Sequence, residues 1–228
     1  ARGAMRHEIA EGLRYVLGHR LLRWIAATTA SANLFSSMIS AILVLYLVRR
    51  LGMSPGLIGL VMTTGNVGWL VGAMLAGRLG ARLGIGRVTV GAIGLCGLGT
   101  LLIPLAPEAA PIPLLIGGEF LQSFGSTTYN IGQVSLRQAI TPRRLHGRMN
   151  ATMRFMVWGT LPLGATLGGA LGSAMGLRPT LWLASAASLL PVLPALLSSV
   201  WPVRSVEEAI PRFAPASPEQ QQARVSTL

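Results

Sequence analysis

The sequence predicts an all-α membrane protein with six transmembrane helices. A bilayer core of about 30 Å needs about 20 apolar residues in a helix, and six stretches of that length contain almost no charged residues. The stretches are residues 24–48, 51–77, 88–107, 109–136, 155–177 and 179–203. The chain is 51% hydrophobic and contains 28 glycines, which suits closely packed membrane helices better than a soluble core.

The distribution of arginine predicts the orientation of these helices. The 19 basic residues are all arginines. When the connecting segments are assigned alternately to the two sides of a membrane, only Arg49, Arg50 and Arg178 fall in the second set. Cytoplasmic loops are the ones that retain arginine. We therefore expect a multi-pass protein of the plasma or inner membrane, with both termini in the cytoplasm.

The chain divides into three parts in order. Residues 1–20 are charged and mildly amphipathic, which predicts a cytoplasmic linker helix lying on the inner membrane surface. Residues 21–203 hold the six spans. Ser54–Pro55 and Thr141–Pro142 each place a capping residue before a proline, so they predict the starts of the second and fifth spans. Residues 204–228 have little apolar content and predict a disordered cytoplasmic tail.

Glycine and proline predict the turns, bends and contacts of the spans. Residues 77–87 combine four glycines with arginines, which favours a tight inner turn. Pro191 and Pro194 predict a kink in the sixth span, and Pro162 predicts a loosened backbone in the fifth. The fifth span also repeats glycine at intervals of four, which lets another helix approach closely. These glycines are Gly164, Gly168, Gly172 and Gly176.

The fourth span carries a polar stripe along one helical face, because its polar residues follow at intervals of 3, 4, 4, 3 and 4. They are Glu119, Gln122, Ser126, Asn130, Gln133 and Arg137. Unpaired polar groups are costly in hydrocarbon, so this face must meet protein or water. Hydrogen bonding between helices is one interpretation. The length of the stripe favours the other, a face that lines a solute pathway.

Glu119 is the candidate for proton coupling. It is the only carboxylate within any predicted span, and intramembrane carboxylates are expensive and usually functional. A structural carboxylate bonded to neighbouring helices is the alternative. The first span carries a shorter stripe of Thr29, Asn33, Ser36 and Ser40, of which Asn33 is the strongest candidate for the pathway.

Four arginines are predicted to act at the inner face, in a gate or in fixing topology: Arg82, Arg137, Arg148 and Arg154. Arg154 lies at the inner end of the fifth span, so we expect it to reach the inner headgroups or close an inner gate rather than pair with Glu119.

Other classes of function find little support. Motifs for zinc hydrolysis, serine catalysis and phosphate binding are absent, so we expect neither enzymatic activity, nor catalytic residues, nor a cofactor. The single cysteine and three scattered histidines predict no metal site. Nucleic acid is not an expected partner despite the net charge of +12, because the arginines are spread over short loops.

Three segments resemble exporters of the major facilitator superfamily. Residues 134–155, VSLRQAITPRRLHGRMNATMRF, resemble the loop between the tenth and eleventh helices, in the branch that contains the enterobactin exporter and actinobacterial drug-efflux proteins. The segments EIAEGLRYV (8–16) and WGTLPLGA (158–165) are similar to that branch's central linker and eleventh helix. In the inner loop, Gly77, Arg82 and Gly84 match the family motif, but Ala81 stands where the family has an acid.

The resemblance implies that the six spans are the C-terminal half of a twelve-helix transporter. The first and fourth spans would then line the central cavity of a secondary exporter working by alternating access, with binding near the midplane. The expected partners are the lipid bilayer, a small organic substrate such as a drug or siderophore-like compound, protons and a missing N-terminal six-helix half. A six-span homodimer or scaffold and an inactive truncated gene product remain alternatives.

Overall fold

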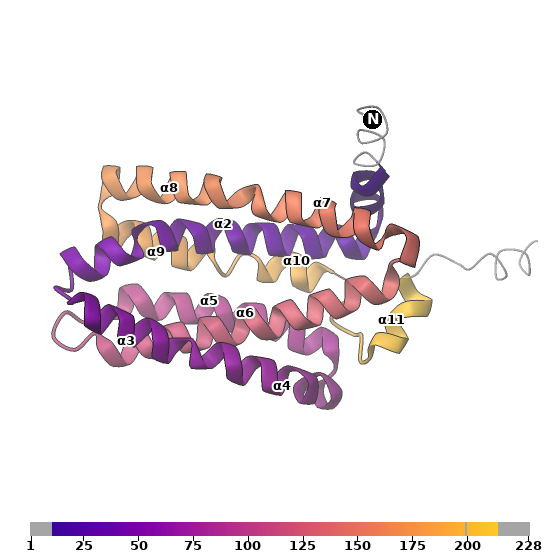
Figure 1. The fold of residues 1–228 in the computed structure, drawn as a ribbon, viewed down its shortest axis with the longest axis horizontal. Coiled ribbons are helices and arrows are strands. Elements are labelled where there is room, and N and C mark those ends of the chain that lie inside the picture. Colours follow the sequence, from indigo (N-terminus) through magenta and orange to yellow (C-terminus); the bar gives the residue numbers. More distant parts are fainter. Residues whose placement is uncertain (1–10, 199, 214–228) are drawn as a thin grey trace, which may run out of the picture.

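The structure is a computed structural model that describes residues 11–198 and 200–213, in which long helices run along a common axis (Figure 1). Residues 11–18 are helical and no strand occurs among the described residues. The elements that follow are α2 (Arg20–Arg49), α3 (Pro55–Gly65), α4 (Val67–Leu83), α5 (Ile85–Leu105), α6 (Ile112–Ile140), the 3-10 turn η1 (Arg143–Leu145), α7 (His146–Trp158), α8 (Thr160–Met175), α9 (Leu177–Ala187), α10 (Val192–Leu197) and α11 (Val206–Phe213).

These elements form six rods of membrane-spanning length. Five of them are both long and apolar enough to cross a membrane: α2, α3–α4, α5, η1–α7–α8 and α9–α10. The sixth, α6, has 29 residues and is long enough, but its polar stripe lowers its hydropathy. The all-α architecture with six spans is therefore confirmed, and the helix that departs from an apolar composition is the one predicted to carry the pathway.

Three spans are interrupted by short breaks. The second span breaks at Asn66, the fifth at Gly159 and the sixth at residues 188–191. The break in the sixth confirms the kink predicted from its prolines. Pro162 lies in the first turn of α8, three residues after the break at Gly159, and it has no N–H to bond the carbonyl of Trp158, the last residue of α7. The break therefore agrees with the loosened backbone predicted from Pro162.

The predicted helix starts had different outcomes. Ser54 caps α3, since its hydroxyl accepts a bond from Leu57 N at 3.4 Å and Pro55 is the first helical residue. The prediction for Thr141 was wrong. Its hydroxyl donates to Arg137 O at 2.6 Å and closes the end of α6, and α7 begins only after η1.

The spans form two layers that face each other. In one layer α2 packs on the fifth and sixth spans, and in the other α6 packs on the second and third (Figure 1). The first span of each sequential set of three therefore lies with the last two of the other set. The helices α2 and α6 have few backbone contacts with each other, whereas α5 contacts α9 across the boundary between the layers.

Each layer is held by a ladder of glycines. A Cβ at Gly164 or Gly168 of α8 would strike the carbonyl oxygens of Leu34 and Met38 on α2, which confirms the predicted packing role. Gly172 faces Ile42 more loosely, and Gly176 forms the turn into α9 with φ of +92°. A second ladder, in the second span, was not predicted. A Cβ at each of its glycines would strike α6, at the Glu119 side chain for Gly65 and at the carbonyl oxygens of Phe120 and Phe124 for Gly68 and Gly72.

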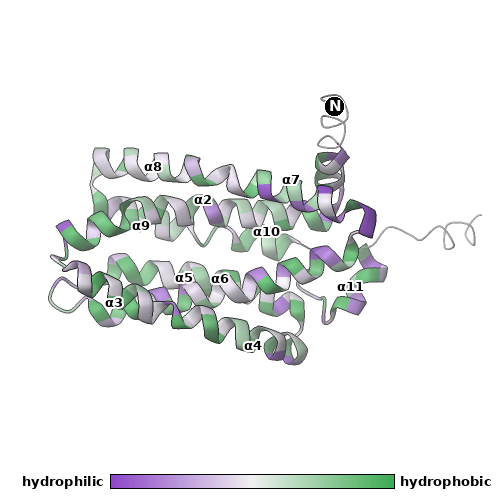
Figure 2. Cartoon of the chain, viewed as in Figure 1, coloured by the Kyte–Doolittle hydropathy of each residue, from purple (hydrophilic) through white to green (hydrophobic). Residues whose placement is uncertain are grey.

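Both ends of the described chain lie at the end of the bundle where hydrophilic residues are concentrated (Figure 2). A one-residue turn at Gly84, with φ of +92°, joins α4 to α5 there, as the predicted tight turn requires. The Ile85 and Gly86 N–H groups donate to the carbonyls of Arg204 and Val203 at 3.1 and 3.0 Å. These bonds fasten the turn to the chain that follows the sixth span.

Part of the predicted disordered tail is ordered. Residues 206–213 form α11, and Ala209 packs in an apolar cluster with Val16 and Leu136. The sequence-based prediction for this part was wrong because a short amphipathic helix needs few apolar residues to bury one face. Residues 214–228, and residues 1–10 of the predicted linker helix, lie outside the described residues.

Candidate functional site

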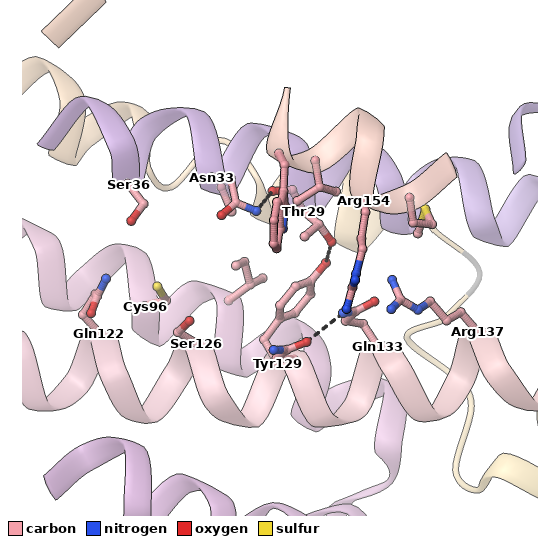
Figure 3. Close-up of a pocket in the computed structure, with 16 residues that line it drawn as sticks. Thr29, Asn33, Ser36, Cys96, Gln122, Ser126, Tyr129, Gln133, Arg137 and Arg154 are labelled. Carbon is pink, nitrogen blue, oxygen red and sulfur yellow. Dashed lines mark hydrogen bonds between the residues drawn. The ribbon is translucent and has the colours of Figure 1, made fainter. Parts of the chain in front are cut away.

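A cavity of about 380 Å³ lies between α2, α6 and α7, and we call it the main cavity (Figure 3). Large apolar clusters fill the bundle toward either end, one around Tyr46 and Leu115 and the other around Leu22 and Met149. The residues that line the main cavity are Thr29, Ala32, Asn33, Ser36, Ile93, Cys96, Gln122, Ser126, Tyr129, Asn130, Gln133, Arg137, Met153, Arg154, Val157 and Trp158.

The α6 stripe supplies most of the polar wall. Five of its six predicted members line the main cavity: Gln122, Ser126, Asn130, Gln133 and Arg137. From Gln122 to Arg137 the helix rises about 22 Å at 1.5 Å per residue. Opposite it, α2 contributes Asn33 together with Thr29 and Ser36. The structure thus brings the two predicted stripes together across one space.

Glu119 lies in an adjoining space of about 120 Å³, which we call the small cavity. Ser36 and Gln122 line both cavities, so the two spaces meet at these side chains. Gly65 allows α3 to approach the Glu119 side chain closely. The Glu119 carboxylate forms no hydrogen bond or ion pair with another described residue. The alternative, in which the Glu119 carboxylate bonds to neighbouring helices, is therefore not supported by the described residues.

A few hydrogen bonds order the main cavity. The hydroxyls of Tyr129 and Thr29 are 2.7 Å apart and link α6 to α2, and Tyr129 is only 6% exposed. Gln133 donates from Nε2 to Asn130 Oδ1 at 2.9 Å, while its buried Oε1 lacks a described partner. Asn33 donates to Thr29 O at 3.0 Å. Asn33 therefore braces its own helix while it faces the cavity.

The four predicted inner-face arginines occupy different positions. Arg137 and Arg154 both line the main cavity, and the Arg154 guanidinium stands 5.7 Å from the ring centre of Trp158. Figure 3 shows Arg154 reaching from α7 toward α6 rather than away from the bundle. Arg148 instead pairs with Glu11. Arg82 is exposed in the last turn of α4.

Several lining residues were missed in the sequence. Tyr129 falls three residues after Ser126 and four before Gln133, so helical spacing places it on the stripe; it was overlooked because an aromatic ring is ordinary in a membrane helix. Cys96 and Trp158 come from other spans. Their positions depend on how the layers meet, which no spacing within one helix encodes.

The match to a family model decides the class of protein. Residues 25–224 match the Major Facilitator Superfamily. The chain belongs to this superfamily. No curated protein and no solved structure matched the chain.

Membership of the major facilitator superfamily makes the chain an integral membrane protein of a transporter family, and its six spans fit half of a facilitator fold. In this fold each six-helix half contains two repeats of three helices. The pairing of α2 with the last two spans, and of α6 with the second and third, agrees with two interlocked repeats. Facilitator proteins bind small molecules within the membrane, and the two cavities between the repeats offer such a place.

Proposed function

We propose that the chain is the C-terminal half of a secondary active exporter that moves a small organic molecule by alternating access. A polar seam, formed by the stripe residues of α2 and α6 around the two cavities, carries this proposal. Polar side chains in contact with lipid hydrocarbon cost free energy, whereas a polar substrate needs such side chains along its path. An N-terminal six-helix half, added by the rest of the protein, would close the open side of the main cavity.

The packing of the layers supports alternating access. Glycine ladders hold α2 on α8 and α6 on α4, so each layer is tight within itself. Across the seam, α2 and α6 are joined mainly by the Tyr129–Thr29 bond. Behind the seam α5 contacts α9, where Thr100 bonds to Ser185 and Ser188, so the two layers form one unit that can rock against an N-terminal half about a fixed binding site. The side with the arginine-rich loops would be the cytoplasm.

Glu119 is proposed to carry the coupled proton. It is a carboxylate at span depth, it faces the small cavity, and the described residues supply neither an arginine nor another charged group around it. Burial without a counter-ion favours the neutral form of a carboxyl group, and substrate in the adjoining main cavity can influence that balance through Gln122. Binding and release of the proton would then alternate with those of the substrate.

Flux through proteoliposomes tests the proposed function. The protein as its gene encodes it would be reconstituted and given an imposed gradient of one pH unit with a cation, a neutral compound and an anion: ethidium, chloramphenicol and 2-naphthoate. One unit corresponds to about 1.4 kcal/mol, enough for about tenfold accumulation per exchanged proton. We expect at least one compound to accumulate severalfold more than in protein-free liposomes, where the weak acid 2-naphthoate follows the pH gradient unaided, and to lose this excess without the gradient.

The alternatives predict different results in the same preparation. An inactive truncated product or a scaffold would give no accumulation of any of the three compounds. A six-span homodimer would give accumulation by a particle that contains two copies of the 228-residue chain and nothing else, which mass measurement in detergent detects.

A further inference from the structure

Two arginines face the main cavity without a carboxylate beside them. Arg137 on α6 and Arg154 on α7 both line it, and their positive charges repel each other. Neither guanidinium forms a hydrogen bond or ion pair with another described residue, and Arg137 Nε is buried without a partner. Arg137 is partly buried and Arg154 is exposed, and two cations at one cavity favour an anion between them that offsets their charge.

The described carboxylates are too far away or otherwise engaged to offset that charge. Glu119 lies about 27 Å from Arg137 along α6, at 1.5 Å per residue over 18 residues, and it faces the small cavity. Glu11 pairs with Arg148, and Glu208 pairs with Arg212 at 2.9 Å. Glu108 lies in the turn before α6 and Glu207 at the start of α11. No acidic residue of the described chain lines the main cavity.

The other residues of the cavity wall indicate the chemistry of the ligand that would bind beside the two arginines. Trp158 is 62% exposed and lines the space next to Arg154, while Met153, Val157 and Ile93 add apolar surface. Arginine binds carboxylate and phosphate oxygens in paired hydrogen bonds, and an aromatic face suits a planar ring. Asn130 and Gln133 supply amide groups beside the two guanidiniums.

We infer that the main cavity binds an organic anion, with its anionic oxygens between Arg137 and Arg154 and a ring or other apolar body against Trp158. This inference rests on the proposed transport function and names its substrate class. The Glu119 carboxylate lies in the small cavity, so it does not stand between this anion and the two arginines.

Equilibrium binding tests the inference without requiring flux. Calorimetry on the purified protein would compare 2-naphthoate, 2-naphthylmethanol and 2-naphthylmethylammonium, which share a ring system and differ in charge. We expect naphthoate to bind at least about tenfold more tightly than the other two. Equal affinity for the three compounds, tighter binding of the cation, or no binding of naphthoate would each overturn the inference.

Matched variants locate the site. Arg137→Gln and Arg154→Gln should each weaken naphthoate binding by about ten- to one-hundredfold, while Arg82→Gln, which removes the same charge at the exposed end of α4, should leave it unchanged. Unchanged binding in both cavity variants would overturn the inference. Since Arg137 is partly buried and its variant could misfold, the exposed Arg154 carries the test in that case.

Two further arms separate the possible causes of failure. Phosphatidylglycerol added to the micelles would leave naphthoate binding intact if the site takes a free solute; displacement by an equimolar amount would assign the arginines to a lipid headgroup and overturn the inference. Charge-selective binding that persists while none of the flux compounds accumulates would contradict the proposed transport function and leave the anion site standing.

Discussion

We expect the replacement of Glu119 with glutamine to abolish proton-driven accumulation and to leave passive exchange of the substrate in place. Glutamine keeps the size and hydrogen-bonding capacity of the side chain in the small cavity but cannot carry a proton. The wild-type protein should accumulate its substrate about tenfold under a gradient of one pH unit. The variant should approach an accumulation ratio of about one, because its transport no longer draws on the gradient.

The control for this variant is Ser40→Ala, which alters another residue of the small cavity that does not titrate at physiological pH. It should retain the gradient-driven accumulation. Reconstituted vesicles assayed at several external pH values distinguish the outcomes. An unchanged pH profile and accumulation ratio in Glu119→Gln would contradict the coupling role.

Replacing Gly168 with leucine should prevent α2 and α8 from packing. Even the Cβ of a side chain at Gly168 would strike the Met38 carbonyl oxygen, and a backbone atom held within a helix cannot move aside as a flexible side chain can. Met38 also belongs to the apolar cluster that contains Ile42 and Tyr46. Overpacking of a closed contact costs about 1–3 kcal/mol, and we expect the upper end of this range because the contact is to backbone.

The neighbouring glycine provides a matched control. A Cβ at Gly169 meets nothing within 4 Å, so Gly169→Leu makes the same chemical change in the same turn of α8 and should be tolerated. Thermal unfolding in detergent, followed by size-exclusion chromatography, compares the two variants. Equal melting temperatures would contradict the close approach of α2 and α8.

The polar stripe could be predicted because the period of an α-helix determines which residues share a face. The intervals from Gln122 to Arg137 place them on one side of α6, and the structure puts that side against a cavity. The glycine ladder of α8 was predictable for the same reason. The helices that lie opposite the polar face of α6 and the glycine face of α8 could not be predicted, since the sequence of one helix does not show which helix packs against it.

The errors have specific physical causes. Arg154 was expected at the inner headgroups or in an inner gate, and the structure places it on the wall of the main cavity, away from Glu119. Glu119 was expected on one continuous seam, and the structure divides that seam in two at Ser36 and Gln122. The α3–α4 glycine ladder was missed because its spacing of three and four is less regular than that of α8.

The measurement that most directly tests the hydrated seam between α2 and α6 is thiol labelling. Cys96 is the single cysteine of the chain and lines the main cavity, so a Cys96→Ser background can receive Ser126→Cys, Asn130→Cys or, as a control, Leu98→Cys at an exposed apolar position of α5. Maleimides react with thiolates, which need water to form.

If water fills the seam, N-ethylmaleimide should modify Ser126→Cys and Asn130→Cys rapidly in membranes and leave Leu98→Cys largely unmodified, and a bound substrate should slow the first two. Equally slow labelling of all three positions, with and without substrate, would show that the α6 stripe is sealed in dry contact and would contradict a solute pathway between the two layers.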